Sequence, residues 1–439
     1  MTTLAGLQGN VLDGYRTPHA LYMFVSVTEA RVARRWLASR IGRVTTYGSF
    51  QAARPASTFN LAFGHDGLLA LGVPPIRLAH LEAFRQGMAA RADALGDVGP
   101  SAPARWELGA GDSHALLVLT AAERESLADA ASELRDSLPE GGLTLSHEQH
   151  AYSAPEGREH FGFQDGFSQP AVPGASAPRI GEGTLTLWRR WRRLALGEFV
   201  LGHRDEGGRV PAAPLGPLGD DATFMVVRKL AQDVGAFRSY VAEAAERLHR
   251  EPAWVAAKML GRWQNGSSLA RYPQAPGPPA SQDPNASRFR YGEDPHGYAC
   301  PLGAHVRRAN PRDSLGYQGR LTQRHRIIRR GMSYGAPLPA GISVDDGVAR
   351  GLMFVAYQGA IERQFEFIQG QWLGDGNPLR LGDDRDPILA AEGSNGQMII
   401  QGRPPVFLAG IPRFVTTCGG GYYLLPGIAG LRALADGAC

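Results

Sequence analysis

The stretch HFGFQDGFSQP, residues 160–170, decides the fold that we expect for this chain. Two glycines, Gly162 and Gly166, flank Asp165, and glycine lets a backbone turn tightly where another residue would clash. Asp165 is therefore expected on a bent loop, among phenylalanines that exclude water, which suits a general acid or base. An ordinary turn, in which the aspartate hydrogen-bonds its own backbone, fits the same pattern.

A second segment, CPLGAHVRRANPR at residues 300–312, places His305 after small residues and before several arginines. A neutral imidazole is the usual proximal ligand of haem iron in peroxidases. Small neighbours would let a flat macrocycle approach the backbone, and the arginines would pair with its carboxylates. A single histidine is more often a structural residue, so both interpretations stay open at this point.

A third segment, RHRIIRRGMSYG at residues 324–335, contains closely spaced arginines. Alternate residues of an extended strand point to opposite faces, so Arg329 would share a face with Ile327. An arginine that faces an apolar cavity offers fixed positive charge to a developing anion. A basic strand that faces solvent is the alternative, and either Arg326 or Arg330 is close enough to take the place of Arg329.

Composition indicates a globular protein. The chain has 439 residues, of which 43% are hydrophobic and 20% charged, values typical of soluble folded proteins with room for more than one core. The net charge of +4 is spread along the chain, and lysine occurs only at Lys229 and Lys258. A nucleic-acid binder concentrates its basic residues on one face or tail, so we expect no nucleic-acid partner.

Cysteines and hydropathy bear on the location of the protein. Three widely spaced cysteines provide neither a disulfide framework nor a zinc motif. The sequence has no N-terminal targeting signal and no apolar run of about 20 residues. We therefore expect a cytoplasmic protein without membrane contact.

The order of the predicted elements suggests two similar halves. The first half alternates strands with helices and predicts an α+β unit with helices over an antiparallel sheet, as in ferredoxin-like folds. We expect strands at 19–27, 57–63 and 115–119, helices at 29–41, 76–88 and 122–138, and a helix or turn at 66–71. The second half repeats this order, with strands at 223–227, 351–357 and 414–417 and helices at 234–248 and 361–372. We divide the chain into an N-terminal half, 1–151, an irregular connecting region that carries the GFQDG loop, 152–222, and a C-terminal half, 223–439.

The three segments, in this order, resemble the dye-decolorizing peroxidase family. The GFQDG run at 162–166 fits that family's signature of a glycine, two variable residues, an aspartate and a glycine. Further stretches that look familial lie at 7–12, 197–202, 228–234 and 359–369, so the resemblance covers nearly the whole chain. It implies two ferredoxin-like halves packed together, with haem b held mainly by the C-terminal half.

The resemblance also implies roles for individual residues. His305 matches the proximal iron ligand, Asp165 the distal acid and Arg329 the distal arginine. The residues expected to contact haem are His305, Arg329, Gly162, Phe163, Gln164 and Gly166. The imidazole should be oriented by an acceptor on its other nitrogen, and Asp386 in the acidic segment 383–387 is our candidate.

The implied function is that of a haem-dependent peroxidase. It would reduce hydrogen peroxide and oxidise dyes, phenols or other small aromatic donors through a ferryl intermediate. Asp165 would move a proton between the peroxide oxygens, and Arg329 would stabilise the charge that develops as the O–O bond breaks. Two alternatives are a haem-binding or iron-handling protein with little turnover and a dedicated biosynthetic haem oxidant. The oligomeric state stays open.

Bulky donors cannot enter a buried haem pocket, so we expect them to give electrons to an aromatic side chain at the surface. The candidates are Trp263, Tyr334, Tyr357 and Trp372. The alternative is that these four rings only pack in the interior, as most aromatic side chains do.

Overall fold

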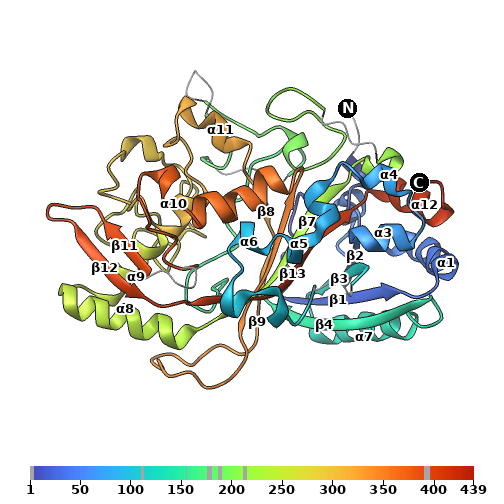
Figure 1. The fold of residues 1–439 in the computed structure, drawn as a ribbon, viewed down its shortest axis with the longest axis horizontal. Helices are drawn as coiled ribbons and strands as arrows, with labels where there is room; N and C mark the ends of the chain where they lie inside the picture. Colours follow the sequence, from blue (N-terminus) through green and yellow to red (C-terminus); the bar gives the residue numbers. More distant parts are fainter. Residues whose placement is uncertain are drawn as a thin grey trace.

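The computed structural model describes residues 4–109, 113–154, 156–175, 180–185, 190–210, 215–389 and 396–439. Within these ranges, strands from both ends of the chain form one large antiparallel sheet (Figure 1). Its strands are β1 (His19–Val27), β2 (Ser57–Phe63), β3 (Ala115–Ala121), β4 (Leu143–Tyr152), β7 (Thr223–Gln232), β8 (Ile328–Arg329), β9 (Met332–Tyr334), β10 (Gly351–Gln358) and β13 (Val415–Leu425).

The sheet closes into a barrel. Its order is β7-β13-β2-β3-β1-β4-β9-β10-β8, and β7 also pairs with β10, which joins the two ends of the row and leaves β8 as an addition to β10. The two halves of the chain meet at two seams, where Leu424 pairs with Phe63 and Ser333 pairs with Tyr152. The expected α+β fold with antiparallel strands is therefore confirmed, and the two half-sheets are continuous with each other.

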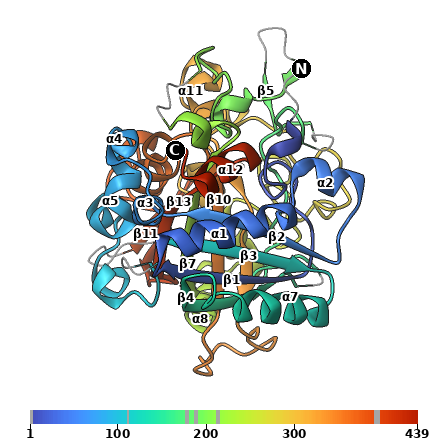
Figure 2. The same ribbon diagram turned by 90° about the vertical axis from the view of Figure 1, so that its right-hand side faces the viewer.

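Helices lie outside the ring of strands. Figure 2 looks from the N-terminal half and shows α7 beside the strands, where it contacts β1, β2 and β3. The helices are α1 (Ala30–Arg40), α2 (Tyr47–Ala52), α3 (His65–Ala70), α4 (Pro75–Leu78), α5 (Glu82–Ala90), α6 (Ala92–Leu95), α7 (Arg124–Asp136), α8 (Val234–Leu248), α9 (Pro252–Leu260), α10 (His305–Ala309), α11 (Arg320–Gln323) and α12 (Ile428–Asp436).

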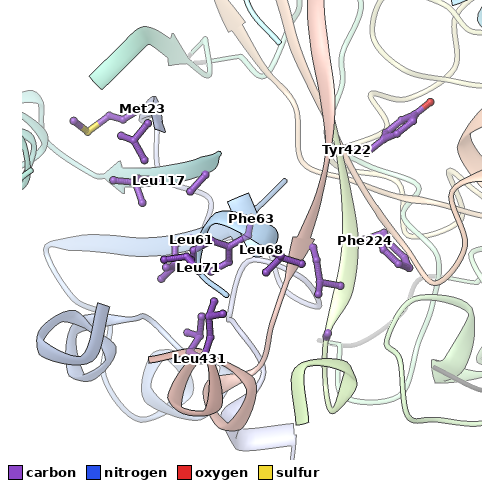
Figure 3. Close-up of a cluster of buried hydrophobic side chains, with 14 of the residues drawn as sticks. Met23, Leu61, Phe63, Leu68, Leu71, Leu117, Phe224, Tyr422 and Leu431 are labelled. Carbon is purple, nitrogen blue, oxygen red and sulfur yellow. The ribbon is translucent and has the colours of Figure 1, made fainter. Parts of the chain in front are cut away.

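Strand β1 shows why these sequences form this sheet. Successive side chains of a strand point to opposite faces. Tyr22 and Phe24 lie in the core that the ring encloses, whereas Met23 and Val25 lie in the core beneath the helices. Because both faces are buried, the strand is one continuous apolar run. Figure 3 shows the outer core, in which side chains of β2, α3 and α12 gather.

Most predicted elements are present, with some differences. The strands expected at 19–27 and 57–63 and the helix at 234–248 have the expected bounds. The single helix expected at 76–88 is wrong, because α4 ends at Leu78 and α5 begins at Glu82. The helix expected at 361–372 consists of two π-helical segments, Glu362–Glu366 and Ile368–Leu373, a form that is rare and concentrates at functional sites.

The last strand is longer than expected. We expect it to end before the three glycines that follow 414–417, but β13 continues to Leu425 and contains Gly419 and Gly420. A side chain on Gly419 would lie 2.2 Å from the Leu108 carbonyl oxygen, and one on Gly420 would lie 2.6 Å from the Val227 carbonyl oxygen. These glycines allow close backbone approach inside the strand rather than ending it.

The chain also has elements that we do not identify from the sequence: β4, α9, α12 and a hairpin of β11 (Gly396–Ile400) and β12 (Val406–Ile411). The hairpin, α8 and α9 form a further apolar core beyond the barrel. The described part of 152–222 contains only the short strands β5 (Thr184–Leu185) and β6 (Trp191–Arg192) and two 3-10 turns. No helix among the described residues has the length and apolar character needed to cross a membrane.

A buried ion pair holds the two halves together. Asp97, after α6, accepts hydrogen bonds from Arg228 of β7 and from Thr417 of β13, and both charged side chains are 3% exposed. We expect Asp97→Ala to lower the free energy of unfolding by about 3–5 kcal/mol, because it leaves the buried Arg228 guanidinium with the Thr417 hydroxyl but without a counter-charge. Urea unfolding measures this. Glu82→Ala is the control, since its pair with Arg85 is half exposed and should contribute less than about 1 kcal/mol. Equal unfolding curves for the two variants would contradict the prediction.

Candidate active site

A cavity of about 330 Å³ lies between the GFQDG loop, α10 and β8. Asp165, His305 and Arg329 all line it, so the fold brings the three sequence segments together. Much of the remaining wall is apolar and includes Leu260, Val306, Ile327, Leu352, Phe354, Ile368, Leu373, Ile388 and Leu389. A cavity of this volume, with an apolar part of the wall and charged and polar groups that converge on it, is typical of a small-molecule site.

His305 is held by a buried carboxylate. It is the first residue of α10, and its Nδ1–H donates to Asp386 Oδ2 at 2.9 Å. Asp386 Oδ1 accepts the backbone N–H groups of Ile388 and Leu389 at 2.9 and 3.0 Å. The side chain of Asp386 is fully buried, whereas 26% of the His305 side chain is exposed. Because Nδ1 is occupied, Nε2 is the ring nitrogen left to bind a ligand in the cavity.

Asp386 and His305 stabilise each other's charged forms. Burial alone would raise the pKa of Asp386, but the charge and hydrogen bond of His305 and the nearby Arg308 lower it overall. Burial alone would lower the pKa of His305, and Asp386 more than offsets this, so the net pKa of His305 is raised. The Asp386 carboxylate therefore makes the imidazole a more basic ligand.

Asp165 and Arg329 form a second polar pair in the cavity. Asp165 Oδ1 lies 3.5 Å from Arg329 Nη1, and their side chains are 39% and 42% exposed. Arg329 is held by a hydrogen bond from its backbone N–H to Gln169 Oε1 at 3.0 Å and by one from Nη2 to the Phe167 carbonyl at 3.3 Å. The expectation that phenylalanines exclude water from Asp165 is wrong in this structure, because the carboxylate opens into the cavity.

The two glycines of the GFQDG loop allow the tight backbone turns that the sequence predicts. Gly162 and Gly166 have φ of 93° and 78°, backbone conformations that other residues rarely adopt. Phe163 packs edge-on against Phe237 and, like Gln164, lines the cavity. The Oε1 atom of Gln164 is buried without a hydrogen-bond partner. The loop thus presents both Gln164 and Asp165 to the cavity.

Glu159 is a site residue that we do not identify from the sequence. Its carboxylate lines the cavity and accepts the backbone N–H groups of Phe161 and Phe163, each at 2.9 Å. It also accepts Gln232 Nε2 of β7 at 2.7 Å. Burial raises the pKa of Glu159, and these hydrogen bonds oppose the rise. Glu159 therefore fastens the loop to the barrel, and an acid three residues before the first glycine of the motif is the only sequence signal for it.

The structure separates the three neighbouring arginines. Arg330 donates to the carbonyls of Asn10, Val11 and Leu12, so it holds the N-terminal segment and does not line the cavity. Arg326 lines the cavity and is 8% exposed, and burial with nearby Arg312 lowers its pKa to about 9. Among the three, only Arg329 has a recorded contact with Asp165.

The arginines that follow His305 differ from the expectation. Arg307 binds Asp294 and the Cys300 carbonyl, and Arg308 binds the carbonyls of Gly303 and Trp372, so neither lines the cavity. Arg312 does line it and donates to three backbone carbonyls. Another lining arginine is Arg262, whose pKa burial lowers to about 10. Together with Arg326 and Arg329, these residues give the cavity a positive wall.

The four aromatic candidates for a surface electron donor are all buried. Trp263, Tyr334, Tyr357 and Trp372 are each 4% exposed or less, and they pack in three different apolar cores. The expectation that one of them meets a bulky donor at the surface is therefore wrong, and the packing alternative describes these rings.

Two family models match this chain, one on each side of the GFQDG loop. The family described as DyP dimeric alpha+beta barrel domain matches residues 6–149, and the family described as Dyp-type peroxidase, C-terminal, matches residues 264–382. The dye-decolorizing peroxidase msp1 of Mycetinis scorodonius is 27% identical, over 98% of this chain and 87% of that protein. The multifunctional dye peroxidase DyP2 of an Amycolatopsis species is 30% identical, over 67% of this chain and 64% of that protein.

Solved structures are similar over the whole chain. A fungal DyP-type peroxidase from Auricularia auricula-judae superposes with a TM-score of 0.84 at 26% identity, covering 99% of each chain. An ancestral D-type dye decolorizing peroxidase has a TM-score of 0.84 at 27% identity, covering 98% of each chain. The fold of the whole chain therefore has counterparts among solved DyP-type peroxidases.

Proposed function

We infer that this chain, which belongs to the dye-decolorizing peroxidase family, is a haem peroxidase that reduces hydrogen peroxide with electrons from dyes or other aromatic donors. The observation that carries this function is one cavity lined by His305 and by the pair of Asp165 and Arg329, 3.5 Å apart. A histidine ligand and a proton-transferring pair are the groups that peroxide cleavage needs.

The residues of the cavity fit haem b. The apolar wall suits a porphyrin ring, and the buried arginines Arg312 and Arg326 suit its two carboxylates, since guanidinium pairs well with carboxylate. Cavity-lining polar atoms that are buried without a partner, Gln164 Oε1, Asn310 Oδ1 and Arg413 Nη2, also favour a polar occupant. Haem b, when bound, supplies the iron that binds peroxide and the conjugated ring that exchanges electrons with donors.

His305 and Asp386 would form the iron-binding side of the site. His305 would bind iron through Nε2, and Asp386 would hold the ring by its Nδ1–H bond. Asp386 is itself fixed by two backbone N–H groups. This arrangement limits rotation of the imidazole and raises its basicity.

Asp165 and Arg329 would act on peroxide. Asp165 Oδ1 faces Arg329, which leaves Oδ2 to take the proton from one peroxide oxygen and deliver it to the other. Arg329 would stabilise the negative charge that develops as the O–O bond breaks. A haem carrier without turnover has no use for such a pair, so the iron-handling alternative is not favoured.

The function is tested by loading the purified protein with haem and titrating it with hydrogen peroxide in the presence of an anthraquinone dye. We expect a Soret band that changes on addition of peroxide and a loss of dye colour that depends on peroxide. A haem-loaded protein that oxidises neither the dye nor a phenol would contradict the proposal. A strong preference for one metabolite over these donors would instead favour a dedicated biosynthetic oxidant.

Arg329→Leu is expected to slow the reaction of the haem-loaded protein with peroxide about 10²–10³-fold, the range for losing one preorganised donor. Arg326→Leu should slow it less, because Arg326 does not contact Asp165. Arg330→Leu should leave the rate nearly unchanged, since that guanidinium binds N-terminal carbonyls. Stopped-flow absorbance at the Soret band measures all three rates. A larger loss for Arg326→Leu would move the assignment to Arg326.

Asp386→Asn is expected to raise the reduction potential of the haem iron. Asparagine can still accept the Nδ1–H of His305, but it lacks the negative charge that makes the imidazole a stronger electron donor to ferric iron. Activity should fall about 10–100-fold, as for other outer ligand partners. Spectroelectrochemistry of the haem-loaded variant measures the potential, and an unchanged potential would argue against this role.

Three further points remain proposals. The division of the chain at residues 151 and 222 is supported by the scarcity of regular elements between β4 and β7. A cytoplasmic location is supported by Cys300, Cys418 and Cys439, which are free thiols. The donors would be small aromatic molecules or dyes.

A further inference from the structure

A second cavity lies outside the haem site, between α9 and the turn of the β11–β12 hairpin. Its volume is about 410 Å³, and it shares no lining residue with the first cavity. Three cationic side chains line it, Arg250, Lys258 and Arg403, together with the aromatic rings of Trp254 and Tyr298. Figure 1 shows α9 beside this hairpin, at the opposite end of the molecule from α1.

The cations lie against the rings. Trp254 and Lys258 are one turn apart on α9, and Lys258 Nζ lies 5.5 Å from the centre of the Trp254 ring. The Arg250 guanidinium lies 5.5 Å from the same ring, and the Arg403 guanidinium lies 5.9 Å from the Tyr298 ring. The cations therefore lie over the two rings, and the cavity brings positive charge and aromatic surface together, which suits an anion that carries a planar ring.

The positive charge is not neutralised by the described residues. No recorded ion pair joins Arg250, Lys258 or Arg403 to a carboxylate, and no described acidic residue lines the cavity. Lys258 is only 3% exposed, yet its recorded hydrogen bond is to a backbone carbonyl, that of Ala299, at 2.8 Å. Asp294 attracts the ammonium from a distance but forms no ion pair with it, so an anion in the cavity would stabilise the buried charge.

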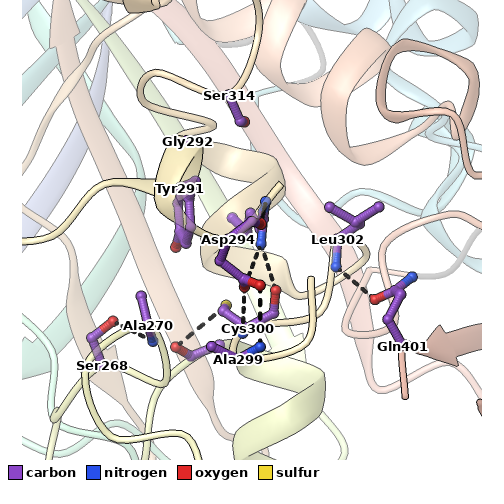
Figure 4. Close-up of polar contacts among 12 residues, drawn as sticks. Ser268, Ala270, Tyr291, Gly292, Asp294, Ala299, Cys300, Leu302, Ser314 and Gln401 are labelled. Carbon is purple, nitrogen blue, oxygen red and sulfur yellow. Dashed lines mark hydrogen bonds and ion pairs between the residues drawn. The ribbon is translucent and has the colours of Figure 1, made fainter. Parts of the chain in front are cut away.

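Asp294, the acid whose charge acts on Lys258, has other partners. Asp294 accepts Arg307 Nη1 at 3.1 Å and the backbone N–H groups of Ala299 and Cys300 (Figure 4). Its charge is thus largely balanced by Arg307, which is fully buried. Figure 4 also shows Gln401, another residue that lines the cavity, accepting the Leu302 N–H at 3.0 Å. The cavity walls are therefore held by the same loop that leads to His305.

We propose that this cavity is a binding site for a planar aromatic anion, an aryl carboxylate or sulfonate. The ring would pack against Trp254 and Tyr298, and the anionic group would lie against Lys258 and Arg403. The site is independent of the haem cavity, and its occupation requires neither peroxide nor turnover.

The test is calorimetric titration of the haem-loaded protein with 2-naphthalenesulfonate, with 2-naphthalenemethanol as the uncharged analogue and inorganic sulfate as the anion without a ring. We expect one sulfonate per chain, weaker binding at higher salt, and at least about tenfold weaker binding of both analogues. The Soret spectrum should stay unchanged during the titration. Binding of the uncharged analogue as tight as that of the sulfonate, or a Soret shift at saturation, would overturn the proposal.

Variants assign the binding to this cavity. Arg403→Gln, which changes an exposed side chain, and Trp254→Leu should each weaken sulfonate binding about tenfold or more. Arg432→Gln is the matched control, because it removes one exposed charge from α12 on the far side of the molecule. Lys258→Met keeps the length of the buried side chain and should abolish the preference for the sulfonate over the uncharged analogue. Wild-type affinity in both Arg403→Gln and Trp254→Leu would overturn the proposal.

Discussion

His305→Ala is expected to give a folded protein that does not retain haem. The imidazole is the only proposed iron ligand from the chain, and alanine removes it while leaving Asp386 bound to the backbone of Ile388 and Leu389. We expect the Soret absorbance per protein, measured after haem loading and desalting, to fall to the level of non-specific binding. Circular dichroism should show unchanged secondary structure, because His305 lies at the start of a short helix.

A second histidine provides the matched control for this experiment. His325 also lines the cavity, but its Nδ1 is bonded to the Arg363 carbonyl and its ring stacks on Phe367 at 4.1 Å. Both contacts fix the ring as a structural element, so His325→Ala should keep its Soret band. Loss of haem in His325→Ala, with retention in His305→Ala, would transfer the ligand role to His325.

Asp165→Asn is expected to slow the reaction with peroxide by about 10²–10⁴-fold, the usual contribution of a general acid–base group. Asparagine has the same shape and can still lie beside Arg329, but it cannot take the proton of peroxide. The Soret band should therefore persist while its change on mixing with peroxide becomes slow. Stopped-flow absorbance measures this rate.

Glu159 is a second carboxylate that lines the cavity, and its substitution provides a comparison for Asp165→Asn. Its oxygens are held by Phe161, Phe163 and Gln232, and burial raises its pKa. Glu159→Gln should therefore slow the reaction much less than Asp165→Asn, through a looser loop rather than a lost proton acceptor. Full rates in Asp165→Asn, together with a large loss in Glu159→Gln, would make Glu159 the proton-transferring group.

Local patterns in the sequence predict much of the barrel. β1 and β2 have the expected bounds because an apolar run buried on both faces is visible without knowledge of its neighbours. The end of β13 is not predicted, because Gly419 and Gly420 look like a turn until the backbones of Leu108 and Val227 are placed against them. Likewise, α9 and the β11–β12 hairpin acquire their stability from a core that they share with distant segments.

The sequence by itself marks the three segments that meet at the cavity, because small residues and glycines beside a histidine or an aspartate are local features, and the family resemblance singles out His305 and Asp165 within them. Only the tertiary structure decides that Arg329 lies beside Asp165, whereas Arg330 binds N-terminal carbonyls. The hydrogen bond of His305 to Asp386 likewise joins residues 81 positions apart. Such partners depend on how strands pair and how loops cross, as when Arg329 pairs with Ala356 of β10, and a local pattern of residues does not contain that information.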